Sequence, residues 1–191
     1  MGSTEVGRLD AWMNNSGFAE FRAHSLVEMA RTIGLPATGR GSIAVASHVS
    51  KNQWQADAGM ETDIRAVIGR SSVFSSLGPT RDGRQKPDIS APGQYLTAAL
   101  ADGSELATLD DRALTPSRLL TIEGTSMATP VVTGVVPLML QRKPTATLAQ
   151  IADVLQRTAR HDVHTGPVGW NPTYGFGKID IAAALQAIGG P

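Results

Sequence analysis

The 191-residue sequence has no cysteine, so it has neither a disulfide framework nor a thiol nucleophile. Its 17 lysines and arginines balance its 17 aspartates and glutamates, which leaves no excess positive charge to attract nucleic acid or an anionic membrane surface. No apolar run reaches the length that a transmembrane helix requires. These absences exclude a disulfide-stapled scaffold and a cysteine-based enzyme. We therefore expect no nucleic-acid partner and no membrane partner.

The composition that remains is typical of a globular protein, with 41% hydrophobic and 18% charged residues. The length fits one domain over residues 1–191, with residues 1–8 as a candidate linker. The N-terminus lacks the charged and then apolar pattern of a signal peptide. The sequence does not by itself assign the protein to a compartment.

Twenty glycines and eleven prolines divide the chain into short segments. Apolar residues at helical spacing predict a helix at Ser25–Ile33. Short apolar runs predict strands of a covered parallel sheet, at Ser42–Ser47, Ser72–Ser75, Lys86–Gly93 and Tyr95–Leu100. Residues 50–70 and 102–118 are polar or charged, and we expect both to be surface loops.

The C-terminal third is predicted to be helical. Apolar residues cover several faces of a helix that begins at Ser126, so we expect this helix to be buried on all sides. Thr147 and Gln150 form a capping-box pattern at the start of a second helix. A third helix is predicted from Asp180 to Ile188.

The segment Gly124–Pro130, with the sequence GTSMATP, places a serine between a glycine turn and a run of small apolar residues. A serine at a helix N-terminus lies beside unpaired backbone N–H groups, which are suited to an oxyanion. Ser126 is therefore a candidate nucleophile, its own N–H a candidate oxyanion donor, and the Thr125 hydroxyl a candidate support. The alternative is that Thr125 and Ser126 only cap a core helix, since both residue types are common caps.

Several segments together resemble the subtilisin family of serine proteases. Gly124–Pro130 matches the nucleophile signature of that family, and the other similar segments are Leu35–Ala37 with Ile43–Val45, Phe74–Pro79, Lys86–Gly93 and Trp170–Asp180. The resemblance runs from about Trp12 to Leu185. It implies an α/β, three-layer fold with a parallel sheet and a buried nucleophile helix. It also implies a cis peptide bond between Leu35 and Pro36.

The sequence departs from the family upstream of these segments. The family order is Asp, then His, then Ser, with the histidine roughly 150 residues before the serine, whereas 125 residues precede Ser126 here. The Asp-Ser/Thr-Gly, His-Gly-Thr and Ala-Gly-Asn patterns of the family do not occur. Asn14 and Asn15 lack the context of the oxyanion asparagine. The chain thus resembles the C-terminal half of the catalytic domain, and we expect a bare sheet edge and an exposed flank on the serine helix.

Local residues offer poor substitutes for the missing histidine and aspartate. We expect His48 to be a capped or solvent-facing residue, and His161, Asp162 and His164 to form a solvated loop between helices. Asp88 is expected to pair with backbone. Glu123 and Gly124 directly precede the motif and are candidate substrate-binding residues. No cofactor is expected; calcium is a possibility that only the family resemblance raises.

Three functions remain open. The first is the nucleophile-bearing portion of a serine endopeptidase, which cleaves protein or peptide substrates through an acyl-enzyme once an upstream part of the domain supplies Asp and His. The isolated chain is then expected to be inactive or nearly so. The second is a non-catalytic pseudoprotease that binds peptides or a partner, and the third is a structural module that dimerises with a second copy. The family is mostly secreted or extracytoplasmic.

Overall fold

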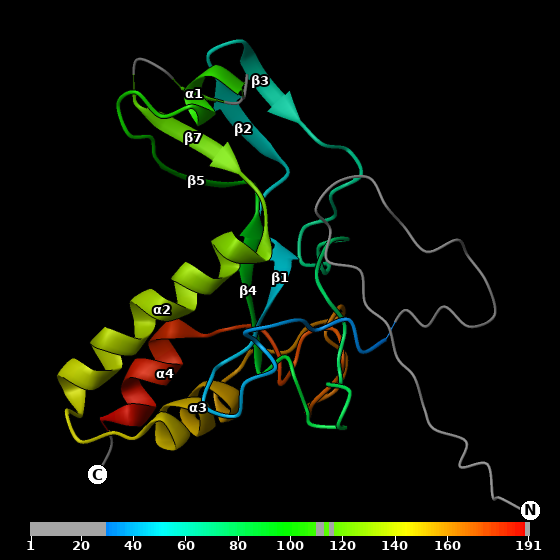
Figure 1. Ribbon diagram of the computed structural model, residues 1–191, viewed down its shortest axis with the longest axis vertical. Coiled ribbons are helices and arrows are strands. Elements are labelled where there is room, and N and C mark those ends of the chain that lie inside the picture. Colours follow the sequence, from blue (N-terminus) through cyan, green and yellow to red (C-terminus); the bar gives the residue numbers. More distant parts are fainter. Residues whose placement is uncertain (1–29, 110–112, 115–116, 190–191) are drawn as a thin grey trace, which may run out of the picture.

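The computed structural model describes residues 30–109, 113–114 and 117–189. A helical part and a β-rich part lie at opposite ends of a central strand pair (Figure 1). In chain order the elements are β1 (Val45–Val49), β2 (Gln53–Ala56), β3 (Gly59–Thr62), β4 (Ile89–Gln94), β5 (Leu96–Ala99), α1 (Leu106–Leu109), β6 (Ala113–Leu114), β7 (Leu119–Ile122), α2 (Thr125–Arg142), α3 (Leu148–Arg157) and α4 (Ile181–Ile188).

The centre of the fold is the parallel pair β1 and β4, in which Val45 lies opposite Ile89. Both strands were predicted from their apolar runs, and both begin about three residues later than predicted. A third extended segment, Gly177–Ile179, pairs with the far edge of β4 through hydrogen bonds to Ser90. The result is a small parallel α/β arrangement that agrees with the predicted fold class.

The other edge of the pair, beside β1, is covered along Ser47–Val49. Ser72 donates its backbone N–H to Ser47 O at 3.0 Å, and Val49 and Arg70 pair at 2.8 Å. The predicted strand at Ser72–Ser75 is wrong: this segment makes one bridge, between His48 and Ser71, and then turns. The segment still binds β1: Ser72 donates its N–H to Ser47 O, and the Ser75 hydroxyl accepts the Ser47 N–H at 3.0 Å. The bare edge that we expected is therefore covered along this stretch.

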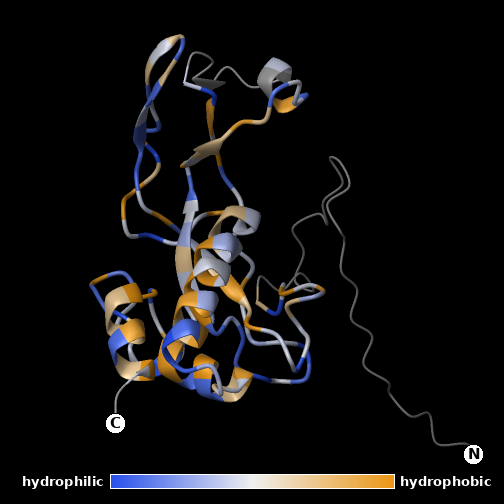
Figure 2. Ribbon diagram, turned by 90° about the vertical axis from the view of Figure 1, so that its left-hand side faces the viewer, coloured by the Kyte–Doolittle hydropathy of each residue, from blue (hydrophilic) through white to orange (hydrophobic). Residues whose placement is uncertain are grey.

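Helix α2 packs along β4 and β1, α4 packs on α2, and α3 packs on α4. Hydrophobic residues gather in this helical part (Figure 2). The helix α2 buries one stripe, which consists of Ala128, Val132, Val135 and Met139. Its opposite side is exposed, at Ser126, Thr129, Pro130, Thr133, Gly134, Pro137 and Leu138. The expectation that α2 is buried on all sides is therefore wrong, because the described chain packs against one side only.

The β-rich part consists of the β2–β3 hairpin and the antiparallel sheet β5–β7–β6. Trp54 stacks on Tyr95 with 4.4 Å between the ring centroids, so Trp54 is a packing residue. The expectation of loops at residues 50–70 and 102–118 is wrong at β2, β3, α1 and β6. In β2 the side chains alternate between exposed and buried, which is the pattern of a half-buried strand. Residues 57–58 form the turn that joins β2 to Gly59, the first residue of β3.

The predicted starts of α3 and α4 are confirmed. Thr147 accepts the Gln150 N–H and the Gln150 side chain accepts the Thr147 N–H, which completes the capping box of α3. Asp180 caps α4 by accepting the Ala183 N–H at 2.9 Å. The peptide bond between Leu35 and Pro36 is cis, as the resemblance implies. The predicted helix at Ser25–Ile33 lies mostly outside the described residues, and its last four residues are not helical.

Candidate active site

Ser126 is the second residue of α2, which begins three residues after the end of β7. The chain leaves β7 at Ile122, turns at Glu123 and Gly124, and enters the helix at Thr125. Gly124 has a φ of 153°, in the region that favours glycine, and its N–H donates to Gly93 O at 2.8 Å. A Cβ on Gly93 would lie 2.8 Å from Ala128 Cβ and from Gly124 O. Two glycines thus allow the end of β4 to approach the start of α2.

The hydroxyl of Ser126 is exposed to solvent and makes no hydrogen bond with the described residues. The backbone N–H groups of Met127 and Ala128 donate to Gly124 O at 2.9 and 3.3 Å, whereas that of Ser126 has no acceptor in the described part of the chain. Its N–H therefore remains available for an oxyanion. Thr125 is half-buried and uses its carbonyl to accept the Thr129 hydroxyl at 2.9 Å.

No histidine of the described chain makes a hydrogen bond to Ser126. His48 on β1 is 6% exposed, and its Nδ1 bonds to the Ser90 hydroxyl at 2.8 Å. Burial lowers the pKa of His48 to about 4, and the positive charge of Lys178 adds to the decrease, so the imidazole is neutral at pH 7. We expected a capped or a solvent-facing His48; the second alternative is wrong, because the side chain is buried and hydrogen-bonded to Ser90. His24, the other histidine that precedes Ser126 in the sequence, lies outside the described residues.

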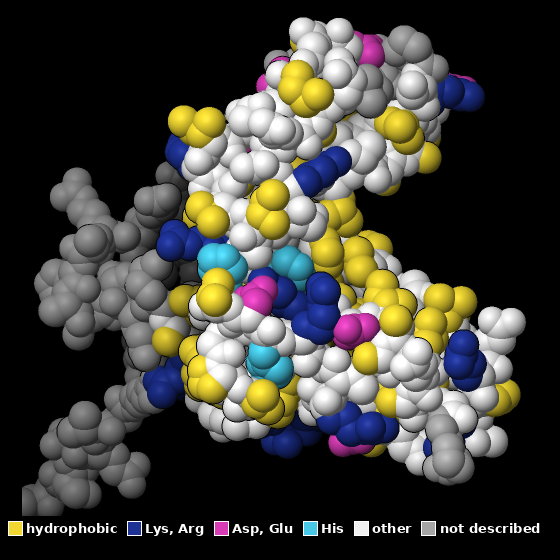
Figure 3. Space-filling view, turned by 180° about the vertical axis from the view of Figure 1, so that it is seen from behind, with side chains coloured by type: hydrophobic (Ala, Val, Ile, Leu, Met, Phe, Trp, Pro, Cys, Tyr) yellow, Lys and Arg dark blue, Asp and Glu magenta, His cyan; other side chains and the backbone are white. Residues whose placement is uncertain are grey.

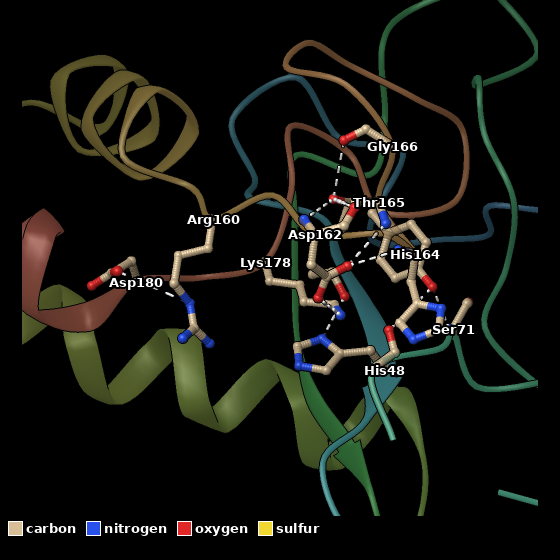
Figure 4. A network of polar contacts seen from close by, with 12 residues as sticks. His48, Ser71, Arg160, Asp162, His164, Thr165, Gly166, Lys178 and Asp180 are labelled. Atoms are coloured by element: carbon tan, nitrogen blue, oxygen red, sulfur yellow. Dashed lines mark hydrogen bonds and ion pairs between the residues drawn. The ribbon is translucent and has the colours of Figure 1, made fainter. Parts of the chain in front are cut away.

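The loop that carries His161 and His164 does not form an improvised triad. Asp162 accepts Lys178 Nζ at 2.6 Å and the backbone N–H groups of His164 and Thr165 (Figure 4). Burial alone would raise the pKa of Asp162, but these hydrogen bonds outweigh it and hold the pKa at about 2. The carboxylate of Asp162 thus orders its own loop and holds a lysine.

Lys178 is the residue in this network that sequence reasoning missed. Its side chain is 5% exposed and lies over the Tyr174 ring, with Nζ 5.5 Å from the ring centre. Lysine is almost never fully buried unless it is paired, and its partner Asp162 is sixteen residues away in sequence. The alternation of Phe176, Lys178 and Asp180 gave no sign of a buried cation. The position of Lys178 is set by pairing with residues distant in sequence, Ser90 of β4 and Arg160.

Asp88 binds backbone and lysine, and the prediction that it pairs with backbone is confirmed. Its Oδ2 accepts the Ala44 N–H at 2.7 Å and Lys86 Nζ at 2.5 Å, and its Oδ1 accepts Gln156 Nε2 at 3.2 Å. Lys86 Nζ also donates to Ser42 O at 2.6 Å. This buried pair ties β4 to the segment before β1 and to α3, and it does not include Ser126.

Seen from behind, the surface is hollowed between the β-rich part and the helical part, with hydrophobic side chains on the walls (Figure 3). A cavity of about 310 Å³ is lined by His48, Pro92, Val131, Arg160, Ile179, Asp180 and Ile181. Neither Ser126 nor Glu123 lines it. Within the described ranges no three histidine, aspartate or glutamate side chains are grouped so that they could hold a metal ion. No helix described here is long and apolar enough to cross a bilayer.

Comparison with known proteins agrees with this geometry. A model of the subtilase family, Peptidase_S8, matches residues 14–177. Serine protease AprX of Bacillus subtilis is 39% identical over 83 residues, which are 44% of this chain and 19% of the relative. Mycosin-4 of Mycobacterium tuberculosis is 30% identical over 80% of this chain and 30% of the relative. Subtilisin NAT of Bacillus subtilis subsp. natto is 33% identical over 81% of this chain and 29% of the relative.

Solved structures show the same relationship. Fervidolysin of Fervidobacterium pennivorans, a keratinolytic enzyme related to subtilisin, superimposes with a TM-score of 0.54 at 29% identity, over 82% of this chain and 20% of that chain. The CspB protease of Clostridium perfringens has the same fold, with a TM-score of 0.59 at 23% identity over 83% of this chain and 28% of that chain. The chain spans less than a third of these curated relatives. Because the family model covers most of its length, the chain belongs to the subtilase family.

Proposed function

We propose that this chain is the nucleophile-bearing portion of a serine endopeptidase. Ser126 Oγ attacks the carbonyl carbon of a peptide bond, the C–N bond breaks, and the acyl group remains on Ser126 as an ester. The hydroxyl proton passes to a base and then to the leaving amine, and water hydrolyses the ester. The N–H of Ser126 stabilises the oxyanion of each tetrahedral intermediate.

The observation that supports this proposal is the exposed hydroxyl of Ser126 at the first turn of α2. A residue that only capped the helix would bond its hydroxyl to a backbone N–H of the first turn, whereas the Ser126 hydroxyl makes no hydrogen bond with the described residues. The serine is therefore held at the surface with its hydroxyl unused. A free serine hydroxyl is a weak nucleophile, so it needs a base that none of the described histidines supplies.

The exposed side of α2 is the surface on which we expect the base to arrive. It begins at Ser126 and continues through Pro130, Thr133 and Pro137, residues that are small or apolar and suit the close approach of another helix. We propose that the Asp- and His-bearing part of the domain packs here. The chain alone is then inactive or nearly so, because Ser126 lacks its proton acceptor.

A fluorophosphonate probe, which reacts with activated serines, tests the proposal. The isolated chain is expected to remain unlabelled, and a protein in which this chain is joined to its Asp- and His-bearing part is expected to label at Ser126. The Ser126→Ala variant abolishes that labelling, and Ser50→Ala, which changes another exposed serine, leaves it intact. Stoichiometric labelling of the isolated chain would contradict the proposal that the base comes from another part of the domain. A joined protein that never labels would contradict the endopeptidase.

A partner-binding module without catalysis is the second candidate function, and the same exposed side of α2 favours it. In that case the chain binds a partner or a second copy through α2, and Ser126 has no chemical role. Light scattering over a range of concentrations measures self-association directly. A dimer that forms equally well with Ser126→Ala, in a joined protein that does not react with the probe, would favour this candidate.

A further inference from the structure

Glu123 carries an exposed carboxylate three residues before Ser126. Several carboxylates of the described chain are paired with a cation, among them Asp88 with Lys86, Asp82 with Arg84 and Asp162 with Lys178. Glu123 has no ion pair and no side-chain hydrogen bond with the described residues. It is therefore a charge beside the candidate nucleophile that the fold does not use.

The backbone that carries Glu123 is held on both sides. Before it, Ile122 pairs with Leu96 in the β5–β7 ladder. After it, the Gly124 N–H donates to Gly93 O, and Gly124 O accepts the N–H of Met127 and of Ala128. With its Cα fixed by strand and helix, the Glu123 side chain can move only by its own rotamers. The carboxylate therefore stays within the reach of one glutamate side chain from the end of β7.

The β-rich part next to Glu123 carries charges of both signs. Tyr95, the residue before β5, donates its hydroxyl to Asp63 Oδ2 at 2.7 Å. Burial and this hydrogen bond raise the pKa of Tyr95, and the negative charge of Glu123 acts in the same direction. Lys51 donates to the Thr97 hydroxyl at 2.5 Å, and Thr97 bonds to Thr121, two residues before Glu123. Lys51 forms no ion pair with Glu123, so the carboxylate remains open to a cation brought by a ligand.

The reach of Glu123 defines which part of a substrate it meets. Three residues of chain span at most about 11 Å between Cα atoms, and an extended peptide advances about 3.3 Å per residue. A carboxylate within this distance of Ser126 can reach substrate residues within about three positions of the bond that is cut. Lysine and arginine are long enough to bring their charge to it.

We propose that Glu123 makes the site prefer substrates with a lysine or arginine within about three residues of the scissile bond. The inference rests on the proposed endopeptidase function. Because Glu123 is exposed and its pairing with a substrate cation is partly screened by water, we expect a preference of about three- to tenfold in kcat/KM. The preference decreases as salt concentration rises.

The test uses the protein in which this chain is joined to its Asp- and His-bearing part. Matched fluorogenic peptides place lysine or glutamine at each position around one cleavable bond. The wild type is expected to cleave the best lysine peptide about three- to tenfold faster at low salt. Glu123→Gln brings the ratio of the two rates to about one, and Glu123→Lys makes it less than one. The control Asp153→Asn removes a charge from α3, at the other end of α2, and leaves the ratio unchanged.

A second readout separates this inference from the function on which it rests. Anisotropy measures the binding of the same lysine and glutamine peptides to the joined protein carrying Ser126→Ala. Cleavage of both peptides at equal rates at every position would overturn the role of Glu123 and leave the endopeptidase intact. A third outcome is also informative. If the lysine peptides bind more tightly than the glutamine peptides, if Glu123→Gln abolishes this difference, and if the wild type cleaves neither, the role of Glu123 would be supported and the endopeptidase overturned.

Discussion

The helical part and the β-rich part of the molecule differ in how much apolar surface they bury. The cluster around α2, α3 and α4 contains twelve buried hydrophobic residues, whereas the cluster of the β-rich part contains five. Because buried apolar area is the main source of stability, the helical part is expected to be the more stable of the two. Ser126 belongs to α2 and Glu123 to the end of the β-rich part, where the two parts meet.

This difference matters for two residues of the candidate site, the proposed nucleophile Ser126 and the proposed substrate-selecting residue Glu123. A nucleophile requires a rigid mount, because small displacements from the reacting geometry are costly, and α2 lies on the β1–β4 pair with its buried stripe in the larger core. Glu123, which we propose to select substrates, is held by backbone hydrogen bonds of the segments on both sides of it. Among the described residues, β5 and β7 contribute none to either buried cluster, and β5 has exposed side chains such as Thr97 and Ala98.

The largest effect is expected from a cavity in the helical core. Met139 on α2 is fully buried, and Met139→Ala is expected to lower the free energy of unfolding by about 2–5 kcal/mol. Urea denaturation followed by circular dichroism measures the change. Leu138→Ala, one residue earlier on the exposed side of α2, is the control and should change stability by less than about 1 kcal/mol. Equal losses for the two variants would show that the exposed side is covered in solution.

A smaller and more local effect is expected in the β-rich part. Trp54→Ala removes the ring that stacks on Tyr95. We expect the loss to fall mainly on β2 and β3, and to lower the free energy of global unfolding by less than Met139→Ala does. Hydrogen exchange of individual amides reads this directly. The amides of the β2–β3 hairpin should exchange faster, and those of α2 should keep their protection. Equal acceleration in α2 would mean that the two parts unfold as one unit.

Local signals explain which elements were predicted. The capping box of Thr147 and Gln150 and the cap at Asp180 are complete within a few residues of sequence, so they mark α3 and α4 without knowledge of the fold. The hairpin β2–β3 and the strands β6 and β7 were missed. The strand predicted at Tyr95–Leu100 is β5, but it lies in an antiparallel sheet and not in the predicted parallel one. Such short strands depend on partners distant in sequence, as Trp54 of β2 does on Tyr95, forty-one residues away. Strand preference depends strongly on such neighbours.

The candidate site also has features that the sequence predicts and features that it does not. The position of Ser126 at the start of α2 follows from the motif Gly124–Pro130. The open side of α2 does not, since the sequence alone does not show what packs against it. The lysine pairs of Asp88 and Asp162 are also invisible in the sequence pattern, because burial of Lys86 and Lys178 arises where separate segments cross.

His48, on β1 of the central strand pair, also makes the stability of the protein depend on pH. Because the folded pKa of His48 is about 4 and its ordinary value is 6.5, the unfolded chain binds more protons than the folded one between these values. Stability from this group is fully present above pH 6.5 and is lost as the pH falls to 4, by about 2–3 kcal/mol. Denaturation at a series of pH values measures the slope, and His48→Asn should flatten it in this window.

The neighbours of His48 allow its contribution to be separated. Lys178 and Arg160 oppose its protonation, and Asp162 favours it. Asp162 has a folded pKa of about 2, below its ordinary 3.8, so its own stabilising effect is lost only as the pH falls below about 4. A slope between pH 6.5 and 4 that persists in His48→Asn would contradict the assignment to this histidine.

The smallest effect is expected at the edge of the helical part, where a helix start is exposed. Thr147→Ala removes the hydroxyl that accepts the Gln150 N–H at 3.3 Å and breaks the capping box of α3. We expect a loss of about 1 kcal/mol, measured as a shift of the urea midpoint at constant m-value. Thr145→Ala, at an exposed residue two positions before the cap, is the control and should lie within about 0.5 kcal/mol of the wild type. Because α3 contributes Ile151, Val154 and Leu155 to the larger core, the loss should appear in global unfolding. A loss confined to faster exchange of the α3 amides would show that α3 unfolds independently of α2 and α4.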